Sequence, residues 1–256
     1  MEYTGERIGF EAIAVKERRG GLDLPFLALT LTLLTIGVVM VLSASYARAY
    51  YSAATDHNAA YYFMRQLGFA LAGVAAMYLL SLLPMQFYRR ISLMVLLGAI
   101  GLLTLVPFIG VSQGDAKRWI DLGFTTFQPS EIAKIGIILY FAALICKFRG
   151  RMKTVKYGIL PFAGVLLVVV ALLVMEPHFS AAIIIIAIGA VMLFLGGVRL
   201  YWFVGALAIA AVGLGVIITF FPYASGRITT WLDPFANTSG DGYQIIQSLY
   251  AIGSGG

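Results

Sequence analysis

Seven long apolar runs constrain the fold of this chain more than any other feature of its sequence. Each approaches the roughly 20 residues that cross a hydrocarbon core about 30 Å thick. Strands of a membrane barrel would alternate apolar and polar residues, whereas the segment 181–190 is apolar on every face. The pattern therefore predicts an all-α polytopic membrane protein with seven transmembrane helices. The predicted spans cover residues 26–46, 63–83, 91–109, 130–146, 158–175, 179–196 and 202–221.

Composition and charge agree with a membrane location. The chain is 61% hydrophobic and 12% charged, whereas soluble domains carry about 25% charged residues. Its net charge of +6 could suggest nucleic acid, but the Lys and Arg residues lie beside the ends of the apolar runs, so we expect no nucleic-acid partner. The positive-inside rule places the basic connection 147–156 in the cytoplasm, together with the N-terminus.

The first apolar run follows a basic stretch and ends in the small residues Ser43, Ala44 and Ser45, which superficially resembles a cleaved signal peptide. The run is too long for a typical signal peptide, so we expect a first transmembrane helix. Residues 1–24 are predicted to be a cytoplasmic tail, and residues 25–256 a single membrane domain. An odd number of spans leaves the C-terminus outside, and we interpret the domain as incomplete at that end.

Polar residues at membrane depth are functional candidates, because they are costly to bury there. Pro129 suits the first turn of the fourth span, and either Ser130 or an upstream polar residue could cap that helix. Glu131 and Lys134 are three residues apart, so they share one helix face and can pair. The pair could simply pin helices together.

Alternatively, Glu131 and Lys134 could line a polar chamber that receives an anionic substrate. Lys117 and Arg118, in the preceding outer loop, would then supply donors to phosphate.

Two further outer segments carry polar residues. Glu176 and His178 could be metal ligands, but two ligands are a weak signal and a turn directed by Pro177 is favoured. The segment 226–244 is predicted to be a structured loop. Its Asp233 and Asp241 could hold a divalent cation or act as a general base, or they could be solvated in an ordinary turn.

Several ordered motifs together resemble the SEDS family (shape, elongation, division and sporulation), which includes FtsW, RodA and SpoVE. The resemblance covers about residues 26–256 and is closest to the FtsW and SpoVE branch. The motifs are Ala116-Lys117-Arg118-Trp119-Ile120, Phe127-Gln128-Pro129-Ser130-Glu131 with Lys134, Glu176-Pro177-His178-Phe179, Trp231-Leu232-Asp233-Pro234, and 242–256.

The resemblance implies a fold of ten transmembrane helices, of which the last three would be absent here, in the bacterial plasma membrane. It also implies polymerisation of lipid II into peptidoglycan strands during division or cell-wall growth, assisted by Mg²⁺ or Mn²⁺. The implied partners are a class B penicillin-binding protein and other division or elongation proteins. By this resemblance the substrate-binding residues are Lys117, Arg118, Gln128, Glu131, Lys134 and Gln244.

One position departs from the family pattern. Family members usually carry a second Asp-Pro whose Asp is the proposed catalytic residue, and ungapped alignment places Asn237-Thr238 there. An amide can ligate a cation but is not a base. We expect Asp241, or else Asp233, to replace it as base and as metal ligand. Otherwise the chain is weakly active, or it is a lipid II flippase or a noncatalytic scaffold.

Overall fold

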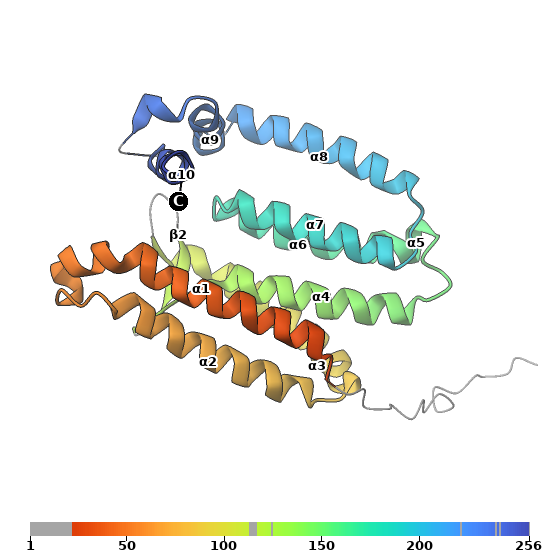
Figure 1. Cartoon of the computed structure of the whole chain (residues 1–256). Helices are drawn as coiled ribbons and strands as arrows, with labels where there is room; N and C mark the ends of the chain where they lie inside the picture. Colours follow the sequence, from red (N-terminus) through yellow and green to blue (C-terminus); the bar gives the residue numbers. More distant parts are fainter. Residues whose placement is uncertain are drawn as a thin grey trace, which may run out of the picture. The chain divides into compact units, whose positions relative to one another are not determined.

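The computed structural model describes residues 22–112, 117–123, 125–220, 222–238, 240 and 242–255, and it is mostly helical (Figure 1). The chain divides into two compact units, Met1–Leu83 and Pro84–Gly256. Most of the predicted tail 1–24 lies outside the described residues, and a single membrane domain over 25–256 stays a prediction.

The first unit consists of two long helices joined by a tight connection. Helix α1 spans Leu24–Tyr51, η1 spans Ala53–Thr55, and α2 spans Tyr61–Ser81. Asp23 caps α1, because its carboxylate accepts a 3.1 Å hydrogen bond from the Phe26 amide. The buried Thr55 hydroxyl closes the connection by donating to the Ala49 carbonyl at 2.6 Å.

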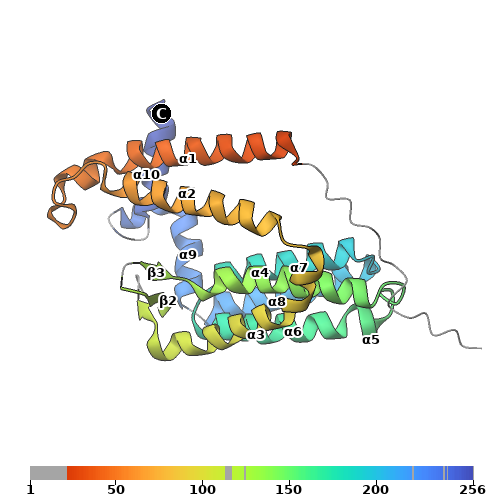
Figure 2. The same cartoon turned by 90° about the horizontal axis from the view of Figure 1, so that it is seen from below.

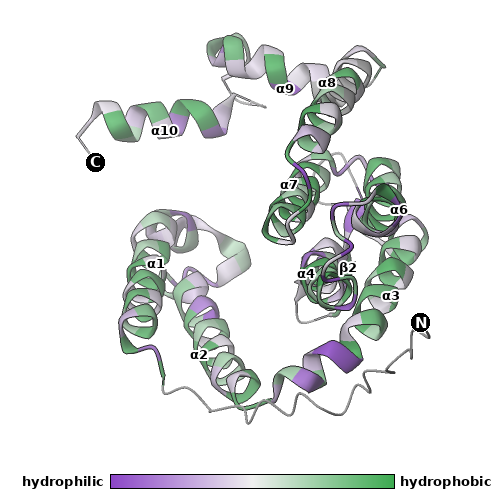
Figure 3. Ribbon diagram, turned by 90° about the vertical axis from the view of Figure 1, so that its right-hand side faces the viewer, coloured by the Kyte–Doolittle hydropathy of each residue, from purple (hydrophilic) through white to green (hydrophobic). Residues whose placement is uncertain are grey.

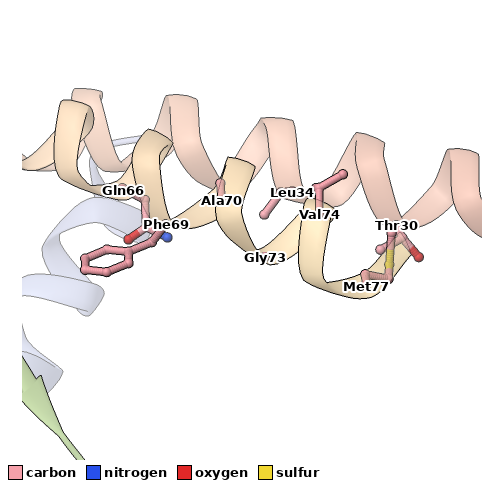
Figure 4. A pocket seen from close by; sticks show the side chains of 8 residues that line it. All are labelled: Thr30, Leu34, Gln66, Phe69, Ala70, Gly73, Val74 and Met77. Carbon is pink, nitrogen blue, oxygen red and sulfur yellow. The ribbon is translucent and has the colours of Figure 1, made fainter. Parts of the chain in front are cut away.

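Helices α1 and α2 enclose a mostly apolar groove of about 310 Å³ (Figure 4). Two polar side chains, Thr30 and Gln66, stand among its lining residues. The groove is formed within the first unit, whereas all the predicted site residues belong to the second. The lining residues are Thr30, Leu34, Gln66, Phe69, Ala70, Gly73, Val74 and Met77.

The core of the second unit lies among the helices α3 (Met85–Ile109), α4 (Pro129–Lys147), α6 (Leu160–Met175) and α7 (Phe179–Leu195). Helix α4 packs against α3 and α7, and α6 packs against α7 and α3. Phe141 and Phe162 meet edge to face at the centre, with ring centroids 4.9 Å apart and both side chains fully buried. These contacts fix the ends of the four helices relative to one another.

The loop between α3 and α4 folds into a small antiparallel sheet, which lies beside the first turn of α4 (Figures 1 and 2). Its strands are β1 (Val111–Ser112), β2 (Lys117–Asp121) and β3 (Thr126–Phe127), in the order β1-β2-β3. Val111 pairs with Trp119 and Ile120 pairs with Phe127. The sheet was not predicted, because two of its three strands have only two residues each, which is too short for an alternating pattern.

The rest of the second unit contains α8 (Tyr201–Phe220), α9 (Pro222–Leu232), η2 (Pro234–Asn237) and α10 (Tyr243–Gly253). The prediction of a loop over 226–244 was wrong for 226–232, which lie within α9, and for 243–244, which begin α10. Pro222 occupies the first position of that helix, where its missing N–H costs no hydrogen bond. Helix α10 lies within the motif 242–256.

The all-α polytopic class is confirmed. Among the residues that the structure describes, five apolar segments are long enough to cross a membrane: α1, α2, α3, α4 and the segment Val155–Met175, which joins the short α5 (Val155–Gly158) to α6. Helix α7 is equally apolar but shorter, and in α8 the segment Tyr201–Gly213 is a shorter apolar stretch. Figure 3 shows that these helices are hydrophobic along most of their length. The count of seven spans stays a prediction.

Candidate functional site

The site begins at the first turn of α4. Pro129 is its first residue, as predicted. The capping prediction was wrong, since neither Ser130 nor the N-cap residue Gln128 caps the helix with its side chain. Ser130 lies inside the first turn with 1% of its surface exposed, and the Gln128 side chain is engaged elsewhere.

Gln128 instead contacts His178, the residue that precedes α7. Its amide Nε2 lies 3.2 Å from the imidazole Nε2. An amide nitrogen only donates, so the imidazole Nε2 is the acceptor in this contact. Nδ1 is buried and has no hydrogen-bond partner within the described part of the chain. The contact brings together two motifs that are 50 residues apart in sequence.

Arg118, on β2, ties the sheet to the same connection. Its guanidinium Nη2 donates a 2.6 Å hydrogen bond to the carbonyl of Pro177. The residue before that proline, Glu176, is only 3% exposed, and its Oε1 has no hydrogen-bond partner among the described residues. Burial raises the pKa of Glu176 to about 7, although the positive charge of Arg118 opposes that rise.

His178 lies where several charges converge. Burial lowers its pKa to about 4, and the positive charges of Arg118, Lys134 and Arg227 lower it as well, while Glu131 acts in the opposite direction. The imidazole is therefore neutral at pH 7. Arg227, an exposed residue of α9, was not predicted to belong to the site. Its basic side chain was the only available signal, and the chain has 18 Lys and Arg residues in all.

The predicted pairing of Glu131 and Lys134 is confirmed. Lys134 Nζ lies 2.7 Å from the Glu131 carboxylate, and the two side chains are 25% and 56% exposed, respectively. Neither charge is sealed in a dry core, so the pair can meet a ligand.

The structure thus gathers Arg118, Gln128, Glu131 and Lys134 around His178. The remaining predicted site residues are placed individually: Lys117 is exposed on β2, Asp233 is exposed just before η2, and Gln244 is exposed on α10. Asn237 ends η2, and Asp241 lies outside the described residues. Their functional assignments stay predictions.

A metal ion requires several convergent ligands. Over the residues that the structure describes, no group of three or more His, Cys, Asp or Glu side chains could hold one. The connection 176–178 is a turn, as predicted. The gathered side chains can bind an anion. The three cations Arg118, Lys134 and Arg227 lie near one exposed carboxylate and a neutral imidazole.

Known proteins resemble this chain over most of its length. Residues 24–256 match the family model FTSW_RODA_SPOVE, described as cell cycle protein. The chain is 36% identical over 236 residues to a probable peptidoglycan glycosyltransferase FtsW of Pseudomonas fluorescens, and 37% identical over 236 residues to one of Trichlorobacter lovleyi. These matches cover 91% of this chain in each case, and 57% and 61% of the two relatives.

Two solved structures resemble the fold. One is a chain of a peptidoglycan synthase complex that coordinates polymerization and crosslinking, with a TM-score of 0.63, 28% identity, and coverage of 87% of this chain and 65% of that one. The other is the rod shape determining protein RodA of Thermus thermophilus, with a TM-score of 0.53, 26% identity, and coverage of 69% and 58%. The chain spans about three fifths of the length of the curated relatives it matches. It belongs to the FtsW, RodA and SpoVE family of cell cycle proteins.

Proposed function

We propose that this protein is a peptidoglycan glycosyltransferase that polymerises lipid II into glycan strands during cell division or cell-wall growth. The observation that carries the proposal is the convergence of Arg118, Lys134 and Arg227 on His178, beside the half-exposed Glu131. Such a group of cations suits a lipid-linked pyrophosphate. The names of the FtsW relatives support the same activity.

In the proposed reaction, the sugar 4-hydroxyl of one lipid II attacks the anomeric carbon of another. A carbon–oxygen bond forms there, the bond from that carbon to the pyrophosphate oxygen breaks, and the hydroxyl proton passes to a base. Arg118 and Lys134, with Lys117 and Arg227, would stabilise the negative charge on the departing undecaprenyl pyrophosphate. Gln128 and Gln244 would contact the substrate by hydrogen bonds.

Asp241 is our first candidate for the base, and Asp233 is the second. Both are carboxylates close in sequence to Asn237, which occupies the place of the family's usual aspartate and cannot accept a proton as a carboxylate does. The same two residues are the candidate ligands of Mg²⁺ or Mn²⁺. The described residues do not by themselves form a site for a metal ion.

The proposed location is the bacterial plasma membrane, with the N-terminus in the cytoplasm. The basic connection 147–156 supports that orientation by the positive-inside rule. The proposed partners are lipid II, a class B penicillin-binding protein and other division or elongation proteins. Similarity to a chain of a peptidoglycan synthase complex supports the partnership with a crosslinking enzyme.

Asn237 favours a second candidate function. A lipid II flippase or a noncatalytic scaffold would use the same cationic cluster but would need no general base. Such a protein would function without a carboxylate at position 237.

The test is an assay of glycan synthesis by the purified protein with lipid II and Mn²⁺ or Mg²⁺. Glycan product that disappears in Asp241→Ala would support the enzyme and the base. Product that persists in both Asp233→Ala and Asp241→Ala would refute the assignment of the base. No product with or without a penicillin-binding protein, while Asn237→Asp also stays inactive, would favour the flippase or scaffold.

A further inference from the structure

A second cluster of charge lies at the opposite end of the four packed helices from the β-sheet. All charged residues are basic at the end of α4, in the short α5, after the end of α7 and near the starts of α3 and α8. Figure 2 shows α5 at the far end of α4 from β2 and β3. The sequence contains no Asp or Glu at 57–114, 132–175 or 177–232. The basic residues are Arg89, Arg90, Lys147, Arg149, Arg151, Lys153, Lys156 and Arg199.

The segment 147–156, which we name the cationic hairpin, is held firmly in place. Met152 is only 4% exposed and belongs to the hydrophobic core, where its methyl group packs at Gly196. Gly158 lies so close to the Met152 carbonyl that a Cβ atom would collide with it. Backbone hydrogen bonds from Arg151 to Phe148 (2.8 Å) and from Thr154 to Arg151 (3.1 Å) close the turns. The hairpin is therefore a preformed surface.

Its cations are exposed, and two of them lie near one aromatic ring. Arg149, Arg151, Lys153 and Lys156 are all exposed. The Arg151 guanidinium carbon lies 5.4 Å from the centroid of the Tyr157 ring, and Lys156 Nζ lies 5.7 Å from the same centroid. Two like charges near one ring repel each other, and a bound anion would relieve that repulsion.

The hairpin also lies at the boundary of the membrane-spanning segments. It joins Pro129–Lys147 directly to Val155–Met175, both of which are long and apolar enough to cross a bilayer. Aromatic residues gather at the same boundary. The Phe148 ring lies 5.3 Å from Tyr157, and Tyr201 and Trp202 begin α8, as is typical of side chains at the level of lipid headgroups.

We propose that the cationic hairpin, together with Arg199, binds the headgroup of an anionic phospholipid. A phosphate at the bilayer surface lies at the depth of these side chains, and each basic residue near such a surface contributes to attraction for anionic lipid. An acidic segment of a soluble protein would meet the same cations, but it would gain nothing from the aromatic residues that border the apolar spans. The inference is independent of the glycosyltransferase assignment.

The experiment is native mass spectrometry of the purified full chain in detergent, titrated with phosphatidylglycerol or with phosphatidylcholine of identical acyl chains. We expect tighter binding of phosphatidylglycerol. The double variant Arg149→Gln/Arg151→Gln should weaken it by at least about tenfold and leave phosphatidylcholine binding unchanged. The matched control is Arg48→Gln/Arg65→Gln, which removes two arginines from the first unit and should change neither affinity.

Lys153→Gln serves as a second variant, because a substitution of this exposed side chain should not disturb folding. We expect it to weaken phosphatidylglycerol binding by about fivefold. Equal binding of the two lipids would overturn the proposal, as would an equal loss in the control. Displacement of the lipid by glycerol phosphate at similar concentration would assign the site to free phosphate, and displacement by a polyglutamate peptide would assign it to an acidic protein.

Discussion

Gln128 and His178 are the N-cap residues of α4 and α7, and their side chains bond to each other rather than to their own helices. The 3.2 Å contact joins the amide Nε2 to the imidazole Nε2. It fixes the two helix starts relative to each other. In this contact the amide nitrogen donates and the imidazole nitrogen accepts.

Breaking this contact should destabilise the protein modestly. We expect Gln128→Leu to lower the free energy of unfolding by about 1 kcal/mol, since the imidazole loses a donor while partly buried. The measurement is a double-mutant cycle with His178→Leu. Thermal unfolding in detergent gives the stability of the parent, of each single variant and of the double variant. A coupling energy of about 0.5–1.5 kcal/mol would agree with the hydrogen bond, whereas strictly additive losses would contradict it.

Glu176 should make stability depend on pH. Its pKa rises from 4.5 to about 7 in the folded protein, so the folded state binds more protons than the unfolded state between these values. Its contribution is therefore fully present below pH 4.5 and is lost as the pH rises through 7. We expect Glu176→Gln to match the parent near pH 4.5 and to exceed its stability above pH 7 by about 3 kcal/mol.

Thermal unfolding from pH 4.5 to 8 measures this difference. Glu131→Gln is the matched control, because that carboxylate is 56% exposed and ion-paired. It should not reproduce the gain at high pH. A Glu176→Gln variant that unfolds in parallel with the parent at every pH would show that the buried carboxyl is not the source of the dependence.

The parts of the fold that depend on local pattern could be predicted from the sequence. Apolar runs located the helices, and a spacing of three residues was enough to predict the Glu131–Lys134 pair. The contacts of Gln128 with His178 and of Arg118 with Pro177 cross 50 and 59 residues. No local periodicity encodes such pairings, because they depend on how α4 and α7 pack.

The two incorrect predictions have the same origin. Ser130 has the right chemistry for an N-cap, but it is the second residue of the helix, because Pro129 takes the first position and Gln128 is the N-cap residue. Gly226 suggested a loop, yet a single glycine is tolerated inside a helix such as α9 at a cost of about 1 kcal/mol. Local propensity was outweighed in both cases by the neighbouring proline or by the surrounding helix.

The Glu131–Lys134 pair tests whether the cluster binds substrate or only pins helices. If Lys134 contacts the pyrophosphate, Lys134→Met should reduce glycan synthesis by about ten- to a hundredfold, because a hydrogen bond to a charged group is lost. Glu131→Gln keeps the cation and should cost less than tenfold. Both variants should change unfolding by less than about 1 kcal/mol, as expected for an exposed pair. Equal losses of activity would instead favour a role in helix packing.

Gly136 sets the distance between α3 and α4, and hence the position of the sheet that joins them. A Cβ atom there would lie 3.1 Å from Leu96 Cα and 3.3 Å from Leu96 N, both backbone atoms that cannot rotate away. We expect Gly136→Ala to push the helices apart and to lower stability by about 1–3 kcal/mol. Thermal unfolding measures the change.

Gly101→Ala is the matched control within α3, since a Cβ atom at Gly101 meets nothing within 4 Å. That variant should be neutral or stabilising by about 0.5–1 kcal/mol, because alanine favours the helix over glycine. A stable Gly136→Ala variant would mean that α3 and α4 can separate without cost. In that case the close approach at Leu96 would not be what holds Arg118 near Pro177, and the position of the site would depend on the contact between α4 and α7 instead.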